Sequence, residues 1–249
     1  NKLTQQFNKI PCKLKIIYGI FGNPGAARNI GLKSAKSDFI MFIDSDDSLL
    51  PKVLTNFISE ELPYSGSDLN IFNYEIEHQN NQVMGVMLSE KNLLQLAFDT
   101  GIWRIIFRRK FISDFSFPEI SMAEDQIFFL ALILKKGSVT FQDQIIYRYR
   151  KGLNSQLTTT REAFDDLLIA QNITSRYIGQ LTGEQLLIAS ILLIRQCLGG
   201  VLYGRTKIKL FSLIKLIIWF LRRPYLVSST LALIFKNNFW KKLRNAKRF

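Results

Sequence analysis

The chain has 249 residues, 47% of them hydrophobic, and carries a net charge of +13 at neutral pH. This length allows one domain with an appended segment and is enough to bury a hydrophobic core. The only histidine, His78, lies in the predicted turn EHQNNQ, which excludes a histidine-based catalytic triad and a histidine-ligated zinc site. The two cysteines, Cys12 and Cys197, have neither metal-ligand nor disulfide spacing, which suits a reducing compartment.

The charge is distributed unevenly along the chain. All 20 acidic residues lie at or before Glu184, where 20 of the 33 basic residues balance them. The other 13 basic residues therefore give the last 65 residues the whole net charge. We expect a first domain over residues 1–180 and a basic helical region over residues 181–249.

The first predicted elements alternate between strand and helix. Residues 13–21 (KLKIIYGIF) have a strand-like composition, and GNPG at 22–25 is a turn signal. Residues 26–37 are predicted to form a helix whose small-residue face suits close packing on a sheet. Residues 39–43 (FIMFI) lack polar alternation, as expected for a parallel strand covered on both faces. Pro51 then suits the first turn of another helix.

The middle of the chain adds strands that indicate an α/β class. Residues 68–77 and 82–88 are predicted to form a strand pair, and residues 139–150 a further strand. Further helices are predicted near residues 90–98 and from a cap at Thr159 and Glu162 to about Tyr177. This order of elements predicts a mixed sheet flanked by helices.

Beyond Gly183 the chain becomes apolar and basic. The segments 184–203, 209–221 and 224–235 are apolar and are interrupted by Lys and Arg. No uncharged run reaches the roughly 18 residues needed to span a bilayer. Apolar helices with Lys, Arg, Trp and Tyr but no acids suit an anionic membrane interface. The alternatives are a basic helical subdomain packed on the main domain and a nucleic-acid surface, although no nucleic-acid-binding motif accompanies the charge.

An acidic cluster follows the apolar run at residues 39–43. Asp44, Asp46 and Asp47 are separated only by Ser45, so their charges repel one another unless a cation lies among them. The carboxyl end of a strand is also where open α/β sheets bind ligands. Mg²⁺ and Mn²⁺ are typically held by one or two carboxylates together with phosphate oxygens and water. The cluster therefore fits either a metal–diphosphate site or a solvated loop that caps the next helix.

The stretch NPGAARNIGLKSAKSDFIMFIDSDDSLLP, residues 23–51, resembles the inverting family-two glycosyltransferases of the GT-A fold. The shared pattern is an Asn/Gly turn, Ala-Arg-Asn-x-Gly, a helix, a short apolar strand, Asp-x-Asp-Asp and a following proline. Three later segments continue the resemblance in the same order: GIWRIIFRRKFI (101–112), FPEISMAEDQIFFLALIL (117–134) and IIYRYRKGLNSQLTT (145–159). The resemblance covers about residues 13–160.

This resemblance implies a metal-dependent nucleotide-sugar site. It makes Asp46 the direct metal ligand, with Asp44 near the ribose or assisting the metal, and Mn²⁺ or Mg²⁺ the cofactor. It also places Arg28 and Asn29 near the nucleotide. Asp125 would be the catalytic base that accepts the proton of the attacking sugar hydroxyl, while the metal neutralises the departing diphosphate.

Asp125 also has a purely structural interpretation. Ser121 and Glu124 form a capping-box pattern that predicts a helix start before the apolar run to Leu134. Glu124 and Asp125 would then lie in the first helical turn, where acids are stabilised by the helix dipole. The dipole favours the ionised form that a base needs, so the two interpretations are compatible.

Four residues are assigned by resemblance to the acceptor or diphosphate side of the site: Trp103, Glu124, Arg148 and Arg150. Trp103 could equally be a core residue rather than an apolar platform for a sugar. Arg148 and Arg150 could be exposed strand charges rather than diphosphate partners.

The N-terminal part of the family pattern is missing. Family members open with a Pro-x-Tyr-Asn-like segment and an Asp-Asp-Gly-Ser-like turn, which hold the nucleotide base and ribose. Asn1 corresponds roughly to their second helix. We therefore expect an N-terminally truncated domain that lacks two central strands and binds the donor weakly.

The leading hypothesis is a metal-dependent inverting glycosyltransferase. It would move a sugar from a nucleotide donor, a UDP-sugar, to a saccharide or lipid-linked acceptor in surface polysaccharide or glycolipid synthesis. The basic C-terminal helices would hold it peripherally at the cytoplasmic face of an anionic membrane, with no nucleic-acid partner. The alternatives are a non-catalytic membrane-surface module that retains the fold and, third, a nucleic-acid binder with a steep salt dependence.

Overall fold

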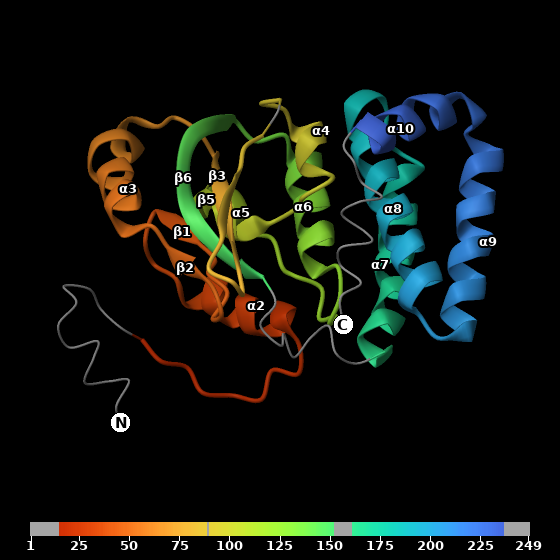
Figure 1. Cartoon of the computed structure of the whole chain (residues 1–249), viewed down its shortest axis with the longest axis horizontal. Coiled ribbons are helices and arrows are strands. Elements are labelled where there is room, and N and C mark those ends of the chain that lie inside the picture. Colours follow the sequence, from red (N-terminus) through yellow and green to blue (C-terminus); the bar gives the residue numbers. More distant parts are fainter. Residues whose placement is uncertain (1–14, 89, 152–160, 237–249) are drawn as a thin grey trace.

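The computed structural model describes residues 15–88, 90–151 and 161–236, which form a curved sheet with helices on both faces and a further group of helices to one side (Figure 1). The first elements are α2 (Pro24–Ser34), β1 (Phe39–Met41), β2 (Ser48–Leu49), α3 (Pro51–Asn56), η1 (Phe57–Glu61), η2 (Leu62–Tyr64), β3 (Leu69–His78) and β4 (Val83–Val86). They are followed by α4 (Leu93–Leu96), η3 (Ile102–Arg104), β5 (Ile105–Arg108), α5 (Arg109–Ile112), α6 (Glu124–Lys135) and β6 (Val139–Lys151). The last are η4 (Arg161–Asp166), α7 (Leu167–Ile178), α8 (Gly183–Tyr203), α9 (Thr206–Arg222) and α10 (Pro224–Lys236). The predicted cap at Thr159 lies outside the described residues.

The six strands form one mixed sheet in the order β1-β5-β3-β6-β2, with β4 paired to β3 beside that path. The central strand, β3, pairs in parallel with β6 and antiparallel with β5 and β4. The strand pair predicted at 68–77 and 82–88 is confirmed as β3 and β4, and the strand predicted at 139–150 as β6. The predicted α/β class with a mixed sheet flanked by helices is likewise confirmed.

Both faces of the first half of β3 are buried. Ile71 belongs to the core under α6, whereas Phe72 packs edge to face on Phe57 of η1, with ring centroids 4.8 Å apart. Because successive side chains of a strand point to opposite faces, one strand can serve two cores. Helices α3 and η1 cover one face of the sheet, and α6 covers the other (Figure 1).

Two strand predictions near the N-terminus are wrong. Residues 15–21 form no strand, and Tyr18 and Ile20 are exposed. The strand β1 is only three residues long and pairs with β5 antiparallel, so residues 39–43 are not a parallel strand covered on both faces. Nothing in the described part of the chain pairs with the other edge of β1, and its apolar side chains line a cavity instead.

Helix α2 starts at a well-formed cap. The side chain of Asn23 accepts a hydrogen bond of 2.8 Å from the amide of Ala26, and Pro24 occupies the first helical turn. The predicted turn at 22–25 and the helix after it are thereby confirmed, although the helix ends at Ser34.

The face of α2 that packs on the rest of the protein is not the predicted one. The small-residue face is exposed at Ala27, Ile30 and Gly31. The close approach is at Gly25, where a Cβ atom would lie 2.2 Å from the carbonyl oxygen of Pro118. Helix α2 therefore turns polar residues inward, toward the site described below.

Helix α6 carries the predicted acids in its first turn but lacks the predicted cap. Its N-cap is Ala123, in the left-handed region at φ 67°, and makes no side-chain capping bond. The amide of Ser121 donates to Oδ2 of Asp166 at 2.7 Å. The capping box of Ser121 and Glu124 is therefore wrong, because each residue is bound by a partner from a distant element.

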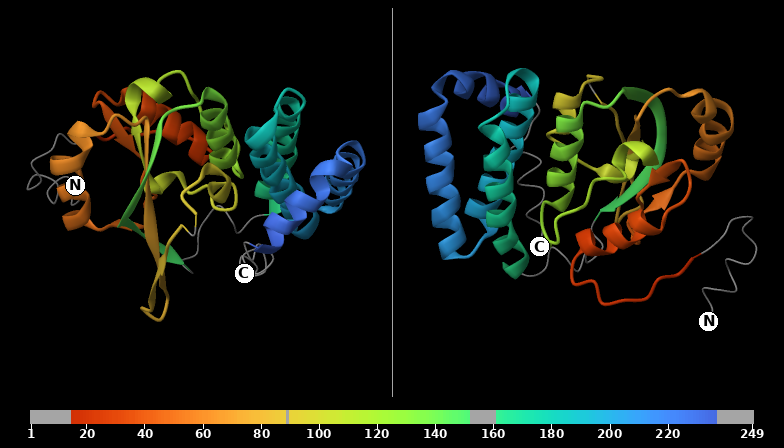
Figure 2. Two further views of the ribbon diagram at one scale, coloured as in Figure 1. Left: turned by 90° about the horizontal axis from the view of Figure 1, so that it is seen from above. Right: turned by 180° about the vertical axis from the view of Figure 1, so that it is seen from behind.

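Helices α7 to α10 stand beside α6 (Figure 2). Helix α8 contacts α7 and α9 within the group and α6 and α4 outside it. Ile188 and Leu192 of α8 belong to the same buried cluster as Leu130 and Ile133 of α6. The helical extension predicted for the C-terminal region is present, and it shares a core with the sheet; a division at residue 180 stays a prediction.

Helix α8 is the one described helix that is long and apolar enough to cross a membrane, judged by length and composition alone. Of its most apolar window, 61% is buried inside the protein. Packing against α6, α7 and α9 accounts for this apolar character.

Candidate active site

Arg28 brings together two acids that are far apart in the sequence. Its guanidinium lies 2.9 Å from Oδ1 of Asp44, in the loop after β1, and 2.5 Å from Oε1 of Glu124, in the first turn of α6. The side chains of Arg28 and Glu124 are only 17% and 11% exposed, so solvent screens this contact weakly. Arg28 from α2 thus supplies a positive charge beside Asp44, the first acid of the cluster.

Arg28, Asp44 and Glu124 together form a clamp, and its charge balance depends on the protonation of Glu124. Burial, followed by the charge of Asp125, raises the pKa of Glu124 to about 7, although Arg28 opposes the shift. Burial alone would lower the pKa of Arg28, but Glu124 and Asp44 outweigh it and the pKa is raised. Arg28 stays charged, and Glu124 titrates near neutral pH.

The third acid of the cluster, Asp47, is tied to β6. Its Oδ2 accepts a hydrogen bond of 2.7 Å from the hydroxyl of Tyr147, which itself accepts one of 3.2 Å from the amide of Asp44. Its Oδ1 accepts a hydrogen bond of 2.8 Å from the amide of Arg150. Burial raises the pKa of Asp47, and these hydrogen bonds oppose the shift. Asp47 and Tyr147 thus hold the acidic loop in place.

Asp46 is different, because it lies exposed in the turn between Asp44 and Asp47. The turn is closed by a hydrogen bond of 3.2 Å from the amide of Asp47 to the carbonyl oxygen of Asp44. The Asp46 side chain makes no hydrogen bond or ion pair with any described residue, so its oxygens can bind a ligand. The described residues contain no group of three or more His, Cys, Asp or Glu side chains that could hold a metal ion. A divalent ion here would need oxygens from a bound phosphate or water as well.

Asp125, the predicted base, is half-buried beside Glu124. Its Oδ2 accepts a hydrogen bond of 2.8 Å from the hydroxyl of Thr100, and its Oδ1 accepts one of 2.8 Å from the amide of Gln126. Thr100 is 4% exposed, so it positions the carboxylate from within the core. No pattern in the sequence around Thr100 indicates this contact.

Asn29 is occupied by a structural contact. Its side-chain amide donates to the carbonyl oxygen of Phe117 at 2.9 Å and accepts from the amide of Phe117 at 2.7 Å. The pair ties α2 to the segment that leads into α6. A role for Asn29 next to the nucleotide stays a prediction.

Arg148 and Arg150 form ion pairs along the surface of the sheet. Nε of Arg148 lies 2.5 Å from Glu75, and Nε of Arg150 lies 3.1 Å from Glu77. These pairs would have to open for either arginine to reach a diphosphate. That role stays a prediction.

Trp103 is half-buried in a stack of aromatic rings. It stacks on Tyr147 with centroids 4.4 Å apart and on Tyr149 at 5.8 Å, and its edge meets Tyr74. Tyr147 links this stack to the acidic loop through Asp47. A role for Trp103 as an apolar platform for a sugar stays a prediction. The alternation YRYR places Tyr147 and Tyr149 on one face of β6, which is the sequence signal for this stack.

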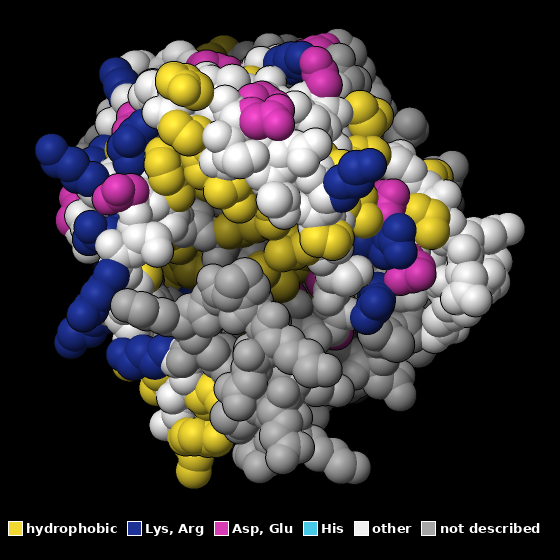
Figure 3. Space-filling model, turned by 90° about the vertical axis from the view of Figure 1, so that its left-hand side faces the viewer, with side chains coloured by type: hydrophobic (Ala, Val, Ile, Leu, Met, Phe, Trp, Pro, Cys, Tyr) yellow, Lys and Arg dark blue, Asp and Glu magenta, His cyan; other side chains and the backbone are white. Residues whose placement is uncertain are grey.

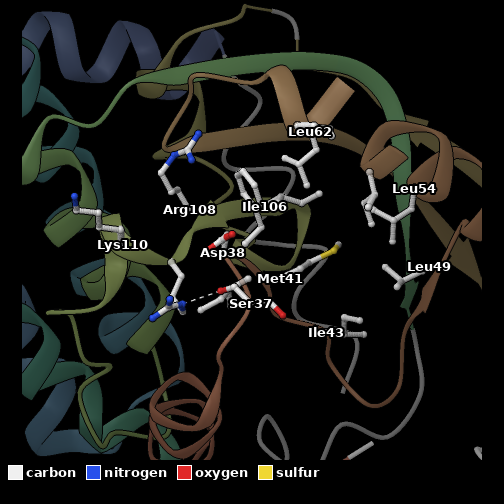
Figure 4. A pocket seen from close by; sticks show the side chains of 15 residues that line it. Ser37, Asp38, Met41, Ile43, Leu49, Leu54, Leu62, Ile106, Arg108 and Lys110 are labelled. Carbon is white, nitrogen blue, oxygen red and sulfur yellow. Dashed lines mark hydrogen bonds between the residues drawn. The ribbon is translucent and has the colours of Figure 1, made fainter. Parts of the chain in front are cut away.

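A cavity lies elsewhere in the protein. It has a volume of about 910 Å³, follows β1 toward α3, and carries Asp38, Arg108 and Lys110 at its polar end (Figure 4). Apolar side chains also gather in a hollow on the side of the molecule that carries α3 (Figure 3). None of the predicted site residues lines this cavity, so the clamp of Arg28 and the cavity are separate features.

Comparison with known proteins agrees with this arrangement. The sequence model of the family described as "Glycosyl transferase family 2" matches residues 2–111. The chain is 27% identical to the putative glycosyltransferase EpsH of Bacillus subtilis over 172 residues, which are 61% of this chain and 49% of the relative. It is 25% identical to the poly(ribitol-phosphate) beta-N-acetylglucosaminyltransferase TarS of Staphylococcus aureus, over 72% of this chain and 34% of the relative.

A solved structure shows the same fold. The crystal structure of residues 1–349 of S. aureus TarS in complex with UDP-GlcNAc superposes with a TM-score of 0.65 at 19% identity. The match covers 85% of this chain and 66% of that chain. The predicted GT-A-type arrangement is thereby confirmed, while this chain spans about half or less of the curated relatives above.

Proposed function

Because the chain belongs to glycosyltransferase family 2, we propose that it transfers a sugar from a UDP-sugar to a saccharide or lipid-linked acceptor. The observation that carries the proposal is the clamp in which Arg28 joins the acidic loop at Asp44 to α6 at Glu124. Asp46 lies two residues after Asp44, and the candidate base Asp125 follows Glu124 directly, so both are close to a member of this clamp in the sequence. The UDP-GlcNAc in the similar TarS structure supports a nucleotide-sugar donor.

The acidic loop is the proposed place for Mn²⁺ or Mg²⁺. Asp46 offers unpaired carboxylate oxygens, and Asp44 can assist, while the diphosphate completes the coordination. A divalent ion bound there would neutralise the charge that develops on the departing diphosphate. The hydrogen bonds of Asp47 and Tyr147 keep the loop preorganised for this task.

Asp125 is the proposed base. It accepts the proton of the acceptor hydroxyl as that oxygen forms a bond to the anomeric carbon and the bond from this carbon to the diphosphate breaks. One displacement of this kind inverts the anomeric configuration. Thr100 holds one carboxylate oxygen, and the helix dipole of α6 favours the ionised form.

Substitution of Asp125 tests the assignment. Asp125→Asn keeps the shape and removes the base, so we expect UDP release from UDP-sugars with Mn²⁺ to fall by about 10² to 10⁴-fold. Asp143→Asn is the matched control, because the side chain of Asp143 is 76% exposed and its ion pair with Lys91 lies at the surface. Full activity of Asp125→Asn, or turnover that is unaffected by removal of metal, would contradict the assigned roles.

We also propose that the C-terminal helices hold the protein at the cytoplasmic face of an anionic membrane. Helix α9 exposes a row of large apolar side chains: Leu210, Phe211, Leu213, Ile214, Ile217, Ile218 and Leu221. Basic residues flank it and no acidic residue follows Glu184, which suits anionic lipid headgroups. This face also supports the second candidate function, a membrane-surface module without catalysis.

Vesicle binding distinguishes these functions. Leu221→Glu should abolish flotation with vesicles that contain phosphatidylglycerol, because it places a charge in the apolar row at a position that is 75% exposed. Met84→Glu, at an exposed position on β4, is the control and should still float. Flotation without any binding of UDP-sugars would favour the non-catalytic module, whereas equal flotation of both variants would remove α9 as the membrane contact.

A further inference from the structure

The loop that presents Thr100 to Asp125 is held from both sides. Residues 97–100 follow α4, and Ala97, Phe98 and Thr100 are all buried. On the side of the sheet, Arg104 is 1% exposed and donates to the carbonyl oxygen of Asp99 at 2.8 Å. The hydroxyl of Tyr74 also donates to the Asp99 carboxylate, at 2.7 Å. The sheet thus fixes one end of the loop.

The other end of the loop is held by a helix of the C-terminal group. Arg195 of α8 donates from Nη1 to the carbonyl oxygen of Ala97, 98 residues earlier in the chain. Helix α8 is placed for this contact by its packing on α4 and α6. Two arginines, one from the sheet and one from the helical group, therefore bind carbonyls at positions 97 and 99 of one short loop.

The charge of Arg195 also interacts with two acids of this region. Burial lowers the pKa of Arg195, and the charges of Asp125 and Asp99 oppose that shift. A partly buried cation beside two carboxylates stabilises their ionised forms. Through this charge, α8 also acts electrostatically on the candidate base.

We propose that Arg195 is a positioning residue for the transfer reaction, which fixes loop 97–100 so that Thr100 keeps its hydrogen bond to Asp125. The proposal rests on the function assigned to Asp125 above. It makes α8 part of the active site, although α8 contributes no group to the chemistry. The C-terminal helices then serve catalysis as well as membrane contact.

Kinetics of matched variants test this role. Arg195→Met should lower kcat by about tenfold to a hundredfold, because small displacements of a catalytic group have effects of this size, while KM for the UDP-sugar changes less than about twofold. Arg195→Lys keeps a charge and a donor and should recover most of kcat. Arg205→Met is the control, since Arg205 belongs to the same helical group and pairs with Asp165 at the surface.

A double-mutant cycle separates positioning from general stability. Thr100→Val removes the hydrogen bond to Asp125, and if Arg195 acts through it, the combined variant should be no slower than the slower single variant. Effects on kcat that multiply, or an equal loss in Arg205→Met, would overturn the proposal.

Hydrogen exchange tests independently of activity whether Arg195 holds loop 97–100. Peptides that cover residues 97–100 should exchange faster in Arg195→Met than in Arg205→Met, while the exchange of β3 is unchanged. If Arg195→Met does not fold, Arg195→Gln provides the same comparison, because its shorter side chain does not reach the carbonyl oxygen of Ala97. If wild-type protein releases no UDP, the failure belongs to the proposed function, and the exchange result still tests the positioning. Identical exchange of the loop in all variants would show that Arg195 does not hold it.

Discussion

At the scale of single residues, the site depends on one cation between two acids from different elements. Arg28 offsets the burial of Glu124, whose side chain is 11% exposed. Removing one partner of such a pair leaves an uncompensated charge, which is strongly destabilising in buried settings. The pKa of Glu124 then determines the pH above which this loss of stability occurs.

Arg28→Met should destabilise the protein more at pH 8 than at pH 5. The pKa of Glu124 is raised to about 7 in the folded protein, above the ordinary value of 4.5, so its contribution to stability is fully present below pH 4.5 and is lost as pH rises through 7. At pH 8 the variant must either protonate Glu124 or bury it ionised and unpaired, and we expect a loss of about 2 kcal/mol in the free energy of unfolding. At pH 5, where Glu124 is mostly protonated, we expect about 1 kcal/mol. Urea unfolding at both pH values measures the difference.

The double variant Arg28→Met/Glu124→Gln provides the control for this prediction. Glutamine cannot ionise, so the difference between the double variant and Glu124→Gln alone should not depend on pH between 5 and 8. A pH dependence that persists in the double variant would assign the effect to another group.

At the scale of elements, the position of α2 depends on the absence of a side chain at Gly25. A Cβ atom there would lie 2.2 Å from the carbonyl oxygen of Pro118, which is backbone and cannot move aside without shifting the segment before α6. Gly31, in the same helix, has nothing within 4 Å of its Cβ position. The two glycines therefore form a matched pair.

Gly25→Ala should lower stability by about 1–3 kcal/mol and reduce activity, because it displaces the helix that carries Arg28. Gly31→Ala should raise stability by up to about 1 kcal/mol, because alanine is the better helix former. Thermal unfolding and UDP release measure both effects. If Gly25→Ala behaves like Gly31→Ala, the close approach to Pro118 is not required for the site.

The helices and strands also differ in how well the sequence predicted them. The helix after Asn23, the strand pair of β3 and β4, and the acids in the first turn of α6 were accessible from local signals, because caps, turns and alternation depend on neighbouring residues. The capping box of Ser121 and Glu124 failed because both residues found partners more than 40 residues away.

Helix α2 shows a second limit of predicting structure from sequence patterns. Small and apolar positions predict the buried face of a helix, yet α2 exposes Ala27 and Ile30 and turns Arg28 inward. The family resemblance placed Arg28, Asp44, Glu124 and Asp125 in one site, and the structure brings them together. The supporting contacts of Tyr147, Thr100 and Arg195 depend on tertiary structure, which no local pattern describes.

At the scale of the whole molecule, the 249-residue chain has an open sheet edge next to an apolar cavity. The outer edge of β1 has no partner among the described residues, and the cavity beside it is lined by Ile43, Leu54 and Ile58. Unpaired strand edges and exposed apolar patches both favour self-association. This property should be measurable in the isolated chain.

We expect the isolated chain to self-associate at micromolar concentration through this edge. Ile58→Lys, at a position that is 47% exposed beside the cavity, should shift sedimentation toward the monomer without lowering stability by more than about 0.5 kcal/mol. Ile169→Lys, equally exposed on α7, is the control and should leave the association unchanged. Sedimentation velocity at several concentrations gives the result, and an equal effect of both substitutions would indicate nonspecific charge repulsion.

The hydroxyl of Tyr147 joins the acidic turn to a strand that is synthesised about a hundred residues later. During translation, the turn at residues 44–47 therefore lacks this support until most of the sheet has left the ribosome. A nascent chain that stalls before β6 would contain the acidic turn but not the hydrogen bonds from Tyr147 that hold it. Formation of the proposed nucleotide site is in this way postponed until β6 has been synthesised.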